Sequence, residues 1–180
     1  MSAQPTPRLT PEQYLAIERA AEFKSEYYKG EMFAMSGGSY AHVIVIGNLV
    51  RELGIALEGR CAVAPSDLRI RVAPDGLYTY PDVIAVCGDP KFADGRTDTL
   101  LNPTLIAEVL SPSTEAKDRV FKWAQYRQIE SLREYVLVSQ DEPRVEVYAR
   151  QPDGSWLFRE FLRSRGAGAI SRRRLRSPSG

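Results

Sequence analysis

The chain has 180 residues, of which 43% are hydrophobic and 26% are charged. This composition is typical of a single globular domain with a sizeable core. No apolar stretch approaches the roughly 20 residues needed to cross a bilayer, and residues 1–10 lack the basic and apolar segments of a signal peptide. These features exclude a membrane-spanning protein, and we expect a cytoplasmic one with no membrane partner.

The charge is distributed unevenly along the chain. The formal net charge is +1, but six arginines and no acidic residue lie in residues 163–180. Residues 1–162 therefore carry a net charge of −5, the +1 of the whole chain less the six arginines. An acidic body argues against a protein that coats DNA through bulk electrostatics. We expect one domain over residues 1–162 and a basic, disordered tail over residues 163–180.

The two cysteines, Cys61 and Cys87, each lie among apolar residues. A free cysteine in such surroundings behaves as a small buried hydrophobic residue. Because cytoplasmic thiols are kept reduced, we expect no disulfide between the two. The sequence has one histidine and no cysteine cluster, which argues against a zinc enzyme.

The first half of the chain predicts two helices with a hairpin between them. Thr10, Pro11 and Gln13 have the positions of a helix cap, a first helical residue and a capping box, so a helix should run to about residue 21. Residues 26–35 are typical of a hairpin that turns at Lys29-Gly30. A loop over residues 36–39 then leads into a long helix over residues 40–58. Its apolar stripe consists of Ile46, Leu49, Val50, Leu53 and Leu57.

The second half predicts a sheet. Residues 67–72 alternate between polar and apolar, as a half-buried strand does. Residues 82–87 and 104–110 are apolar runs, which favour central strands. A helix over residues 115–130 follows, and then come strands over residues 134–139, 144–150 and 155–161. This order predicts a mixed α/β fold with helices on the faces of a central mixed sheet.

Three residues carry most of the functional information. Asp82 opens one apolar run, Glu108 interrupts the next, and Lys122 lies on the helix that follows. An ionised carboxylate in a buried strand is costly unless it is paired or binds a metal. Two such carboxylates with a lysine close behind indicate a divalent-metal site that hydrolyses phosphodiesters.

Ordinary ion pairs are the alternative explanation. Asp82 could simply begin a strand after a proline, and Asp118, four residues before Lys122, could form an exposed salt bridge with it. Glu108 is the hardest to explain in this way, because a carboxylate inside a buried run seldom lacks a role.

Short segments along the chain also resemble the signatures of one protein family. They occur in this order: Lys29-Gly30-Glu31-Met32, His42 with Gly47-Asn48-Leu49, Ser66-Asp67-Leu68-Arg69-Ile70, Tyr80-Pro81-Asp82-Val83, Leu100-Leu101-Asn102-Pro103, Glu108-Val109-Leu110-Ser111-Pro112-Ser113-Thr114, Asp118-Arg119 with Lys122 and Tyr126, and Ser131-Leu132-Arg133-Glu134-Tyr135-Val136-Leu137-Val138. Together they resemble the bacterial Uma2 family, formerly a domain of unknown function, in the PD-(D/E)XK nuclease-like superfamily. The resemblance extends from about residue 9 to residue 161.

The resemblance implies a restriction-endonuclease-like fold and a Mg²⁺- or Mn²⁺-dependent endonuclease that acts on DNA. Asp82 and Glu108 would be the metal ligands, with the carbonyl of Val109 as a further oxygen donor. The superfamily pattern has a lysine two residues after the second acid, where this chain has Leu110. Lys122 resembles a migrated replacement that would orient the attacking water.

Two acidic residues are candidates for additional site residues. Asp67 shares its predicted strand face with Arg69, so it belongs either to a solvated face or to an outer shell around a metal. Glu31 follows the hairpin turn and is either a surface charge or the N-terminal acid that joins the site in parts of the superfamily.

His42 and Tyr126 complete the candidates. His42 begins the long helix and could cap it, form a core hydrogen bond or belong to the site. Tyr126 shares the helical stripe of Lys122 and could line the site or contact phosphate. A catalytically silent module that binds nucleic acid or protein on the same fold is the alternative function, and a different metal-dependent hydrolase is a third. Because nucleases that cut both strands often pair, a homodimer is also possible.

Overall fold

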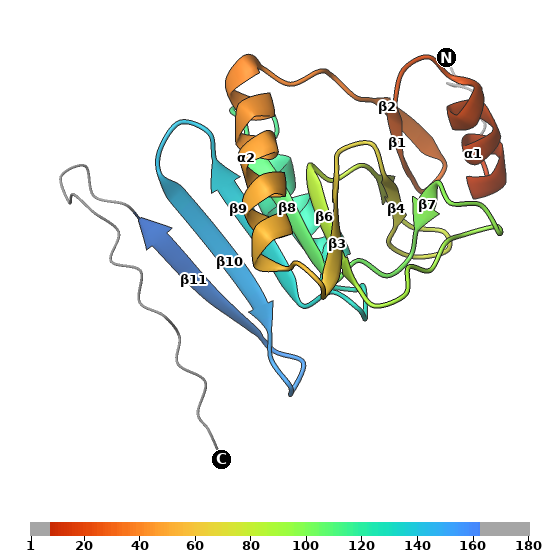
Figure 1. Cartoon of the computed structure of the whole chain (residues 1–180). Coiled ribbons are helices and arrows are strands. Elements are labelled where there is room, and N and C mark those ends of the chain that lie inside the picture. Colours follow the sequence, from red (N-terminus) through yellow and green to blue (C-terminus); the bar gives the residue numbers. More distant parts are fainter. Residues whose placement is uncertain (1–7, 163–180) are drawn as a thin grey trace.

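The computed structural model describes residues 8–162, so the predicted basic tail lies outside the described residues. Figure 1 shows the arrangement of the helices and strands. In chain order they are α1 (Pro11–Ala20), β1 (Ser25–Tyr28), β2 (Glu31–Ala34), α2 (Tyr40–Ala56), β3 (Cys61–Pro65), β4 (Arg69–Arg71), β5 (Tyr78–Thr79), β6 (Val83–Cys87), β7 (Thr99–Leu100), β8 (Leu105–Leu110), η1 (Lys117–Lys122), α3 (Trp123–Tyr126), β9 (Glu134–Ser139), β10 (Arg144–Arg150) and β11 (Trp156–Leu162).

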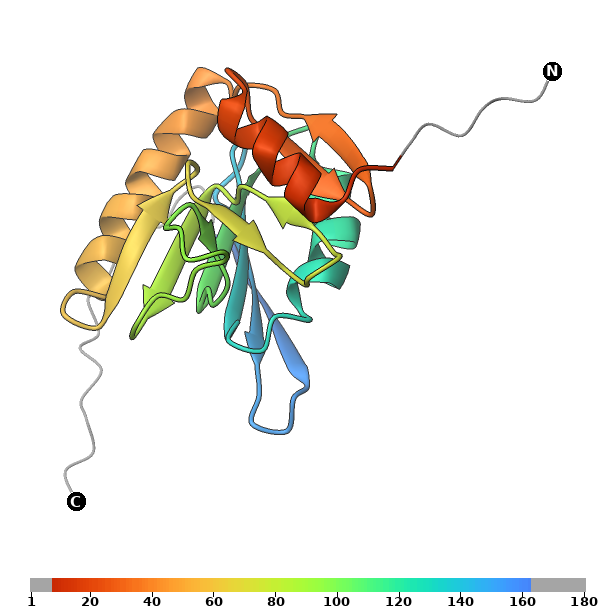
Figure 2. The same ribbon diagram turned by 90° about the vertical axis from the view of Figure 1, so that its right-hand side faces the viewer.

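The strands form two mixed sheets. A six-stranded sheet has the order β11-β10-β9-β8-β6-β3, and a five-stranded sheet has the order β2-β1-β5-β4-β7. Strands β8 and β9 pair in parallel, and η1 with α3 forms the crossover that parallel neighbours require. The hairpin β10–β11 extends away from α1 and the N-terminal hairpin (Figure 2). The predicted mixed α/β architecture is confirmed, although two sheets take the place of one.

Local sequence signals set the N-terminal elements. Thr10 and Gln13 form the predicted capping box at the start of α1, with each side chain accepting a hydrogen bond from the backbone N–H of the other residue. Lys29 and Gly30 make the hairpin turn with φ of 47° and 94°. A Cβ on Gly30 would lie 2.6 Å from the Cβ of Arg8, so both the backbone angle and the close approach favour glycine there.

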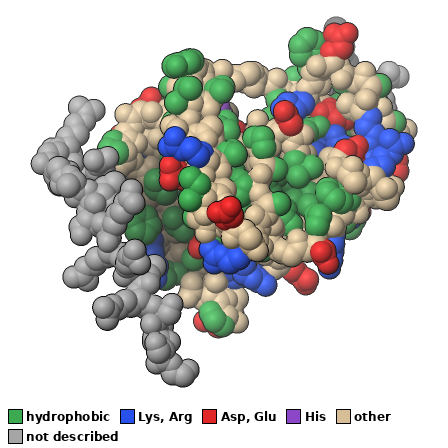
Figure 3. Space-filling view, viewed as in Figure 1, with side chains coloured by type: hydrophobic (Ala, Val, Ile, Leu, Met, Phe, Trp, Pro, Cys, Tyr) green, Lys and Arg blue, Asp and Glu red, His purple; other side chains and the backbone are tan. Residues whose placement is uncertain are grey.

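Helix α2 covers one face of the six-stranded sheet (Figure 1). Its predicted apolar stripe packs against a buried cluster from β6 and β8 that consists of Val83, Ala85, Leu105 and Ala107. Its outward side keeps Val43, Ile44 and Ile55 exposed. Figure 3 views this side of the molecule, where apolar side chains lie among charged ones. Among residues 8–162, neither this helix nor another has the length and apolar character of a membrane span.

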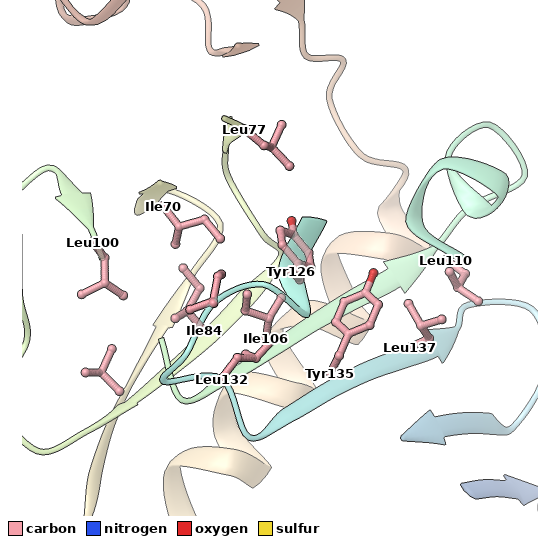
Figure 4. Packing of buried hydrophobic residues seen from close by; sticks show 12 residues of the cluster. Ile70, Leu77, Ile84, Leu100, Ile106, Leu110, Tyr126, Leu132, Tyr135 and Leu137 are labelled. Carbon is pink, nitrogen blue, oxygen red and sulfur yellow. The ribbon is translucent and has the colours of Figure 1, made fainter. Parts of the chain in front are cut away.

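The five-stranded sheet and α3 cover the opposite face. The core there brings Ile84 and Ile106 of the large sheet against Ile70 and Leu100 of the small one (Figure 4). All four side chains are fully buried. This packing fixes the end of β8 relative to the crossover helix, where the functional residues lie.

The crossover is less regular than the helix predicted over residues 115–130. Lys117–Lys122 forms a π-helix and Trp123–Tyr126 forms a single α-turn. Trp123 stacks on Tyr148 and Tyr135 of the large sheet, with ring centroids 4.5 and 5.8 Å apart. The sequence pattern did not reveal the π-turn, because the apolar pattern was compared with the α-helical period alone.

Three strands were not predicted from the sequence. Strands β5 and β7 have two residues each, which is too short for an alternating pattern. Strand β3 contains two alanines and a proline, which have low strand propensity, and it pairs with β6 at the edge of the large sheet.

Cys61 and Cys87 form a disulfide, which corrects the expectation of two free, buried thiols. They lie directly opposite each other on β3 and β6. Cys87 is exposed and Cys61 is half-buried. The expectation was wrong because the pairing depends on β3, which the sequence did not predict.

Reduction of this disulfide should lower the free energy of unfolding by about 3 kcal/mol, because the bond closes a loop between residues 26 apart. Chemical denaturation with and without reductant measures the difference. A Cys61→Ala, Cys87→Ala double variant should show no response to reductant. Two titratable thiols in the unreduced, unfolded protein would contradict the assignment.

Candidate active site

The carboxylates of Asp82 and Glu108 meet at one end of the paired strands β6 and β8. The register places Val83 opposite Ala107, so Asp82, which precedes β6, lies beside Glu108. Asp82 Oδ2 accepts a hydrogen bond of 2.7 Å from the backbone N–H of Val109. The backbone nitrogen of Asp82 is 3.4 Å from Glu108 Oε2. Strand pairing therefore brings the two acids to one point.

Lys122 reaches the same point from η1. Its Nζ is 3.0 Å from Glu108 Oε1 and 3.0 Å from Asp118 Oδ1. Glu108 and Asp118 are each 2% exposed and Lys122 is 7% exposed. The alternative of an exposed salt bridge between Asp118 and Lys122 is therefore wrong, because both side chains are buried and Lys122 also contacts Glu108.

Tyr126 holds Glu108 from the side that faces away from the cleft. Its hydroxyl donates a hydrogen bond of 2.8 Å to Glu108 Oε1, the oxygen that also faces Lys122. The tyrosine is fully buried and is not among the residues that line the cleft. Its place in the structure favours a role in holding Glu108 over a contact with phosphate.

The π-helix determines which side chains of the crossover face the site. In an α-helix, side chains five residues apart point about 140° away from each other. A π-turn is wider and closes its hydrogen bonds from residue i to residue i+5. Lys117, Asp118 and Lys122 consequently all line the cleft.

Burial raises the pKa of Glu108 to about 8. Lys122 lowers this pKa, whereas the negative charges of Asp82 and Asp118 raise it further. Burial works against the charge of Lys122 as well, but Glu108, Asp118 and Glu26 together raise the lysine pKa above its usual value. Lys122 is therefore an ammonium group, and the pKa of Glu108 lies well above its usual value.

Glu26 on β1 is a further acid that the sequence did not point to. It is 4% exposed, lines the cleft, accepts a hydrogen bond from the Thr79 hydroxyl and is ion-paired with Lys117. Burial opposes its ionisation, but Lys122, Lys117 and Thr79 together lower its pKa. The signal that could have found it is the one that identified Glu108, a carboxylate inside a buried strand.

The cleft in front of these groups has a volume of ≈ 340 Å³. Two loops form its rim, one before α2 and one after β8, and they contribute residues 34–39 and 111–114. From the first turn of α2, His42 Nε2 lies 3.2 Å from Asp82 Oδ1, and each of these side chains is 16% exposed. His42 and Val109 thus fix the two oxygens of Asp82.

Gly38→Ala should lower the activity of this site by about tenfold, since a Cβ at Gly38 would lie 2.6 Å from His42 Cδ2 and push the imidazole away from Asp82. Gly37→Ala is the matched control, because a Cβ there meets nothing within 4 Å. Initial rates of both variants beside wild type measure the effect. Equal rates for the two alanine variants would show that the position of His42 does not matter.

Two candidate residues lie away from the cleft. Asp67 belongs to the turn before β4, not to the strand, so the alternation that placed it beside Arg69 does not apply. Its carboxylate pairs with Lys24 at 2.6 Å and its side chain is 87% exposed. Glu31 begins β2 as an exposed residue. Neither is among the residues that line the cleft, where Glu26 is the acid from the N-terminal hairpin.

The donor set suits a hard divalent cation. Within residues 8–162, no group of three or more His, Cys, Asp or Glu side chains is placed to hold a metal ion. An ion would therefore rest on the two carboxylates of Asp82 and Glu108, with water and backbone oxygen as further ligands. Mg²⁺ binds in this way in many phosphate-processing sites, because it keeps several of its waters.

Comparisons with known proteins show the family to which the chain belongs. The model of the Uma2 family, described as "Putative restriction endonuclease", matches residues 11–172. Two proteins from Synechocystis sp. (strain ATCC 27184 / PCC 6803 / Kazusa) are similar over most of the chain. "Uncharacterized protein slr1290" is 38% identical over 161 residues, which are 89% of this chain and 84% of that protein. "Uncharacterized protein sll1609" is 39% identical over 155 residues, or 86% and 88% of the two chains.

A solved structure shares the fold. It is described as a "putative nuclease belonging to DUF820" from Anabaena variabilis ATCC 29413. The TM-score is 0.68 at 19% identity, and the superposition covers 91% of this chain and 89% of the other. The predicted restriction-endonuclease-like fold is thereby confirmed.

Proposed function

Because the chain belongs to the Uma2 family, we propose that it is a metal-dependent endonuclease that hydrolyses phosphodiester bonds in DNA. The observation that carries this proposal is the convergence of Asp82, Glu108 and Lys122 on one cleft, from the residue before β6, from β8 and from η1. Buried groups with shifted pKa values in a cleft are typical of active sites. Family membership indicates the class of reaction, and the cleft contains groups that this reaction needs.

Asp82 and Glu108 would hold Mg²⁺ or Mn²⁺, with the carbonyl of Val109 as a further donor. The bound cation would polarise the scissile phosphate and lower the pKa of a coordinated water. The Lys122 ammonium donates hydrogen bonds to the attacking water or to a phosphate oxygen and offsets the charge that develops there. Since it stays protonated, Lys122 does not accept the proton of that water. His42 keeps the Asp82 carboxylate turned toward the cleft.

The test is a plasmid-nicking assay with wild-type protein in Mg²⁺, in Mn²⁺ and in EDTA. We expect nicked and linear products in either metal and intact supercoiled plasmid in EDTA. Cleavage that persists in EDTA would overturn the metal-dependent mechanism. Absence of cleavage in all three, with the protein folded by circular dichroism, would favour the silent binding module.

Leu110 is the observation that favours this second function. It takes the place of the superfamily lysine and is 4% exposed in the core, so it offers no group to a substrate. If Lys122 does not replace that lysine in function, the fold could still bind nucleic acid without cutting it. Gel-shift binding without cleavage would identify this case.

A further inference from the structure

The walls of the cleft carry more carboxylates than ammonium groups. The four acids are Glu26, Asp82, Glu108 and Asp118, and the two lysines are Lys117 and Lys122. Fully ionised, and leaving His42 aside, these groups sum to a charge of −2. One divalent cation offsets this charge, whereas two would leave an excess of +2 before substrate binds.

The ammonium of Lys122 occupies one of the two positions that the Glu108 carboxylate faces. Glu108 turns Oε2 toward the backbone nitrogen of Asp82 and Oε1 toward Lys122, so its two oxygens face two different positions. In two-metal sites a bridging carboxylate links ions about 3.5–4 Å apart. Here Lys122 Nζ occupies the second position at 3.0 Å from Glu108 and 3.0 Å from Asp118.

Asp118 completes this second position. Its side chain is 2% exposed, and its Oδ1 has no aligned hydrogen bond within the described residues although the ammonium is 3.0 Å away. A buried carboxylate oxygen whose single close partner is a cation requires a positive charge at that place. Glu26 lines the same cleft and is ion-paired with Lys117.

From this geometry we propose that Lys122 takes the place of a second metal ion, so that the site binds one divalent cation, and that Asp118 positions the lysine. The inference rests on the proposed function and extends it to the number of ions. Removal of the lysine should turn its position into a cation site between Glu108 and Asp118. The oxygen donors there suit Mn²⁺ or Mg²⁺.

Counting bound Mn²⁺ by equilibrium dialysis and electron paramagnetic resonance tests the proposal. Wild-type protein should bind one Mn²⁺ per chain, and Lys122→Ala should bind two. The two ions of the variant should give an exchange-coupled spectrum, because Glu108 bridges them. This readout does not depend on cleavage, which Lys122→Ala should lose.

Two variants serve as controls. Lys122→Met fills the position with an apolar chain of similar length, so it should bind one Mn²⁺. Asp118→Asn in the Lys122→Ala background removes a carboxylate from the second site and should return the count to one. A merely structural role for Asp118 would not change the number of ions in this way.

The difference in the number of bound Mn²⁺ ions between Lys122→Ala and wild type tests the inference. The number bound by wild type tests the proposed function. Two ions in wild type, or equal counts in both proteins, would overturn the inference. No ion in wild type but one in Lys122→Ala would support the second position and contradict the proposed metal centre. A Lys122→Ala protein that stays unfolded in Mn²⁺ would also overturn the inference, since the second ion should replace the lost charge.

Discussion

Glu108→Gln should reduce metal-dependent plasmid nicking by about a thousandfold or more. The amide keeps the shape of the side chain and can still accept hydrogen bonds from Lys122 and Tyr126. It removes the negative charge that would hold the cation beside Asp82. Loss of a group that stabilises the transition state in a water-excluded site typically lowers the reaction rate by two to three orders of magnitude. Loss of a metal ligand should lower the rate at least as much.

Initial nicking rates in Mg²⁺ and Mn²⁺ measure this effect. Glu31→Gln is the matched control, because it makes the same chemical change at an exposed residue outside the cleft and should leave the rate unchanged. Circular dichroism and thermal unfolding should show that both variants are folded. Wild-type rates for Glu108→Gln would remove Glu108 from the catalytic site.

In metal-free solution the protein should become less stable as the pH rises from about 4.5 to about 8. The pKa of Glu108 is raised from 4.5 to about 8 by burial. A carboxyl with a raised pKa contributes its full stability below 4.5, where it is protonated in the folded and unfolded states alike. That contribution is lost as the pH rises toward 8, because the unfolded chain releases its proton first. A pKa raised from 4.5 to about 8 corresponds to a loss on the order of 5 kcal/mol.

The groups around Glu108 act on its pKa in both directions. Asp82 before β6 and Asp118 on η1 disfavour its ionisation, Lys122 on the same helix favours it, and Tyr126 on α3 donates a hydrogen bond. Lys122 and Tyr126 have raised pKa values and do not titrate below pH 8. Glu108 therefore dominates this part of the stability profile.

Urea denaturation in EDTA between pH 4.5 and pH 8.5 measures the profile, with Glu108→Gln as the comparison. The glutamine variant should show a flatter dependence on pH, and saturating Mn²⁺ should remove the decline in wild type by stabilising the ionised carboxylate. Asp98 does not contribute in this window, because its hydrogen bond from Arg19 lowers its pKa to about 2. Parallel profiles for wild type and Glu108→Gln would contradict the assignment.

Local sequence patterns were enough to predict the larger elements and the two central acids. The capping box at Thr10, the stripe of α2 and the apolar runs of β6 and β8 are local patterns, so they could be recognised without a partner. A carboxylate inside such a run is visible for the same reason, which is why Asp82 and Glu108 could be singled out. Lys122 could be identified as a site residue only with the help of the family resemblance, because a lysine on a helix is usually exposed.

The surroundings of these acids could not be predicted, because they depend on how the elements pack together. The pairing of β3 with β6 joins the two cysteines, the packing of Trp123 accompanies the π-turn, and the fold of the hairpin brings Glu26 rather than Glu31 to the cleft. Each of these depends on contacts between residues far apart in the chain. Periodicity reports which face of an element is buried, but it carries no information on what that face meets. Lys122 lies only four residues from Asp118, but its contact with Glu108 joins η1 to β8 and is of that kind.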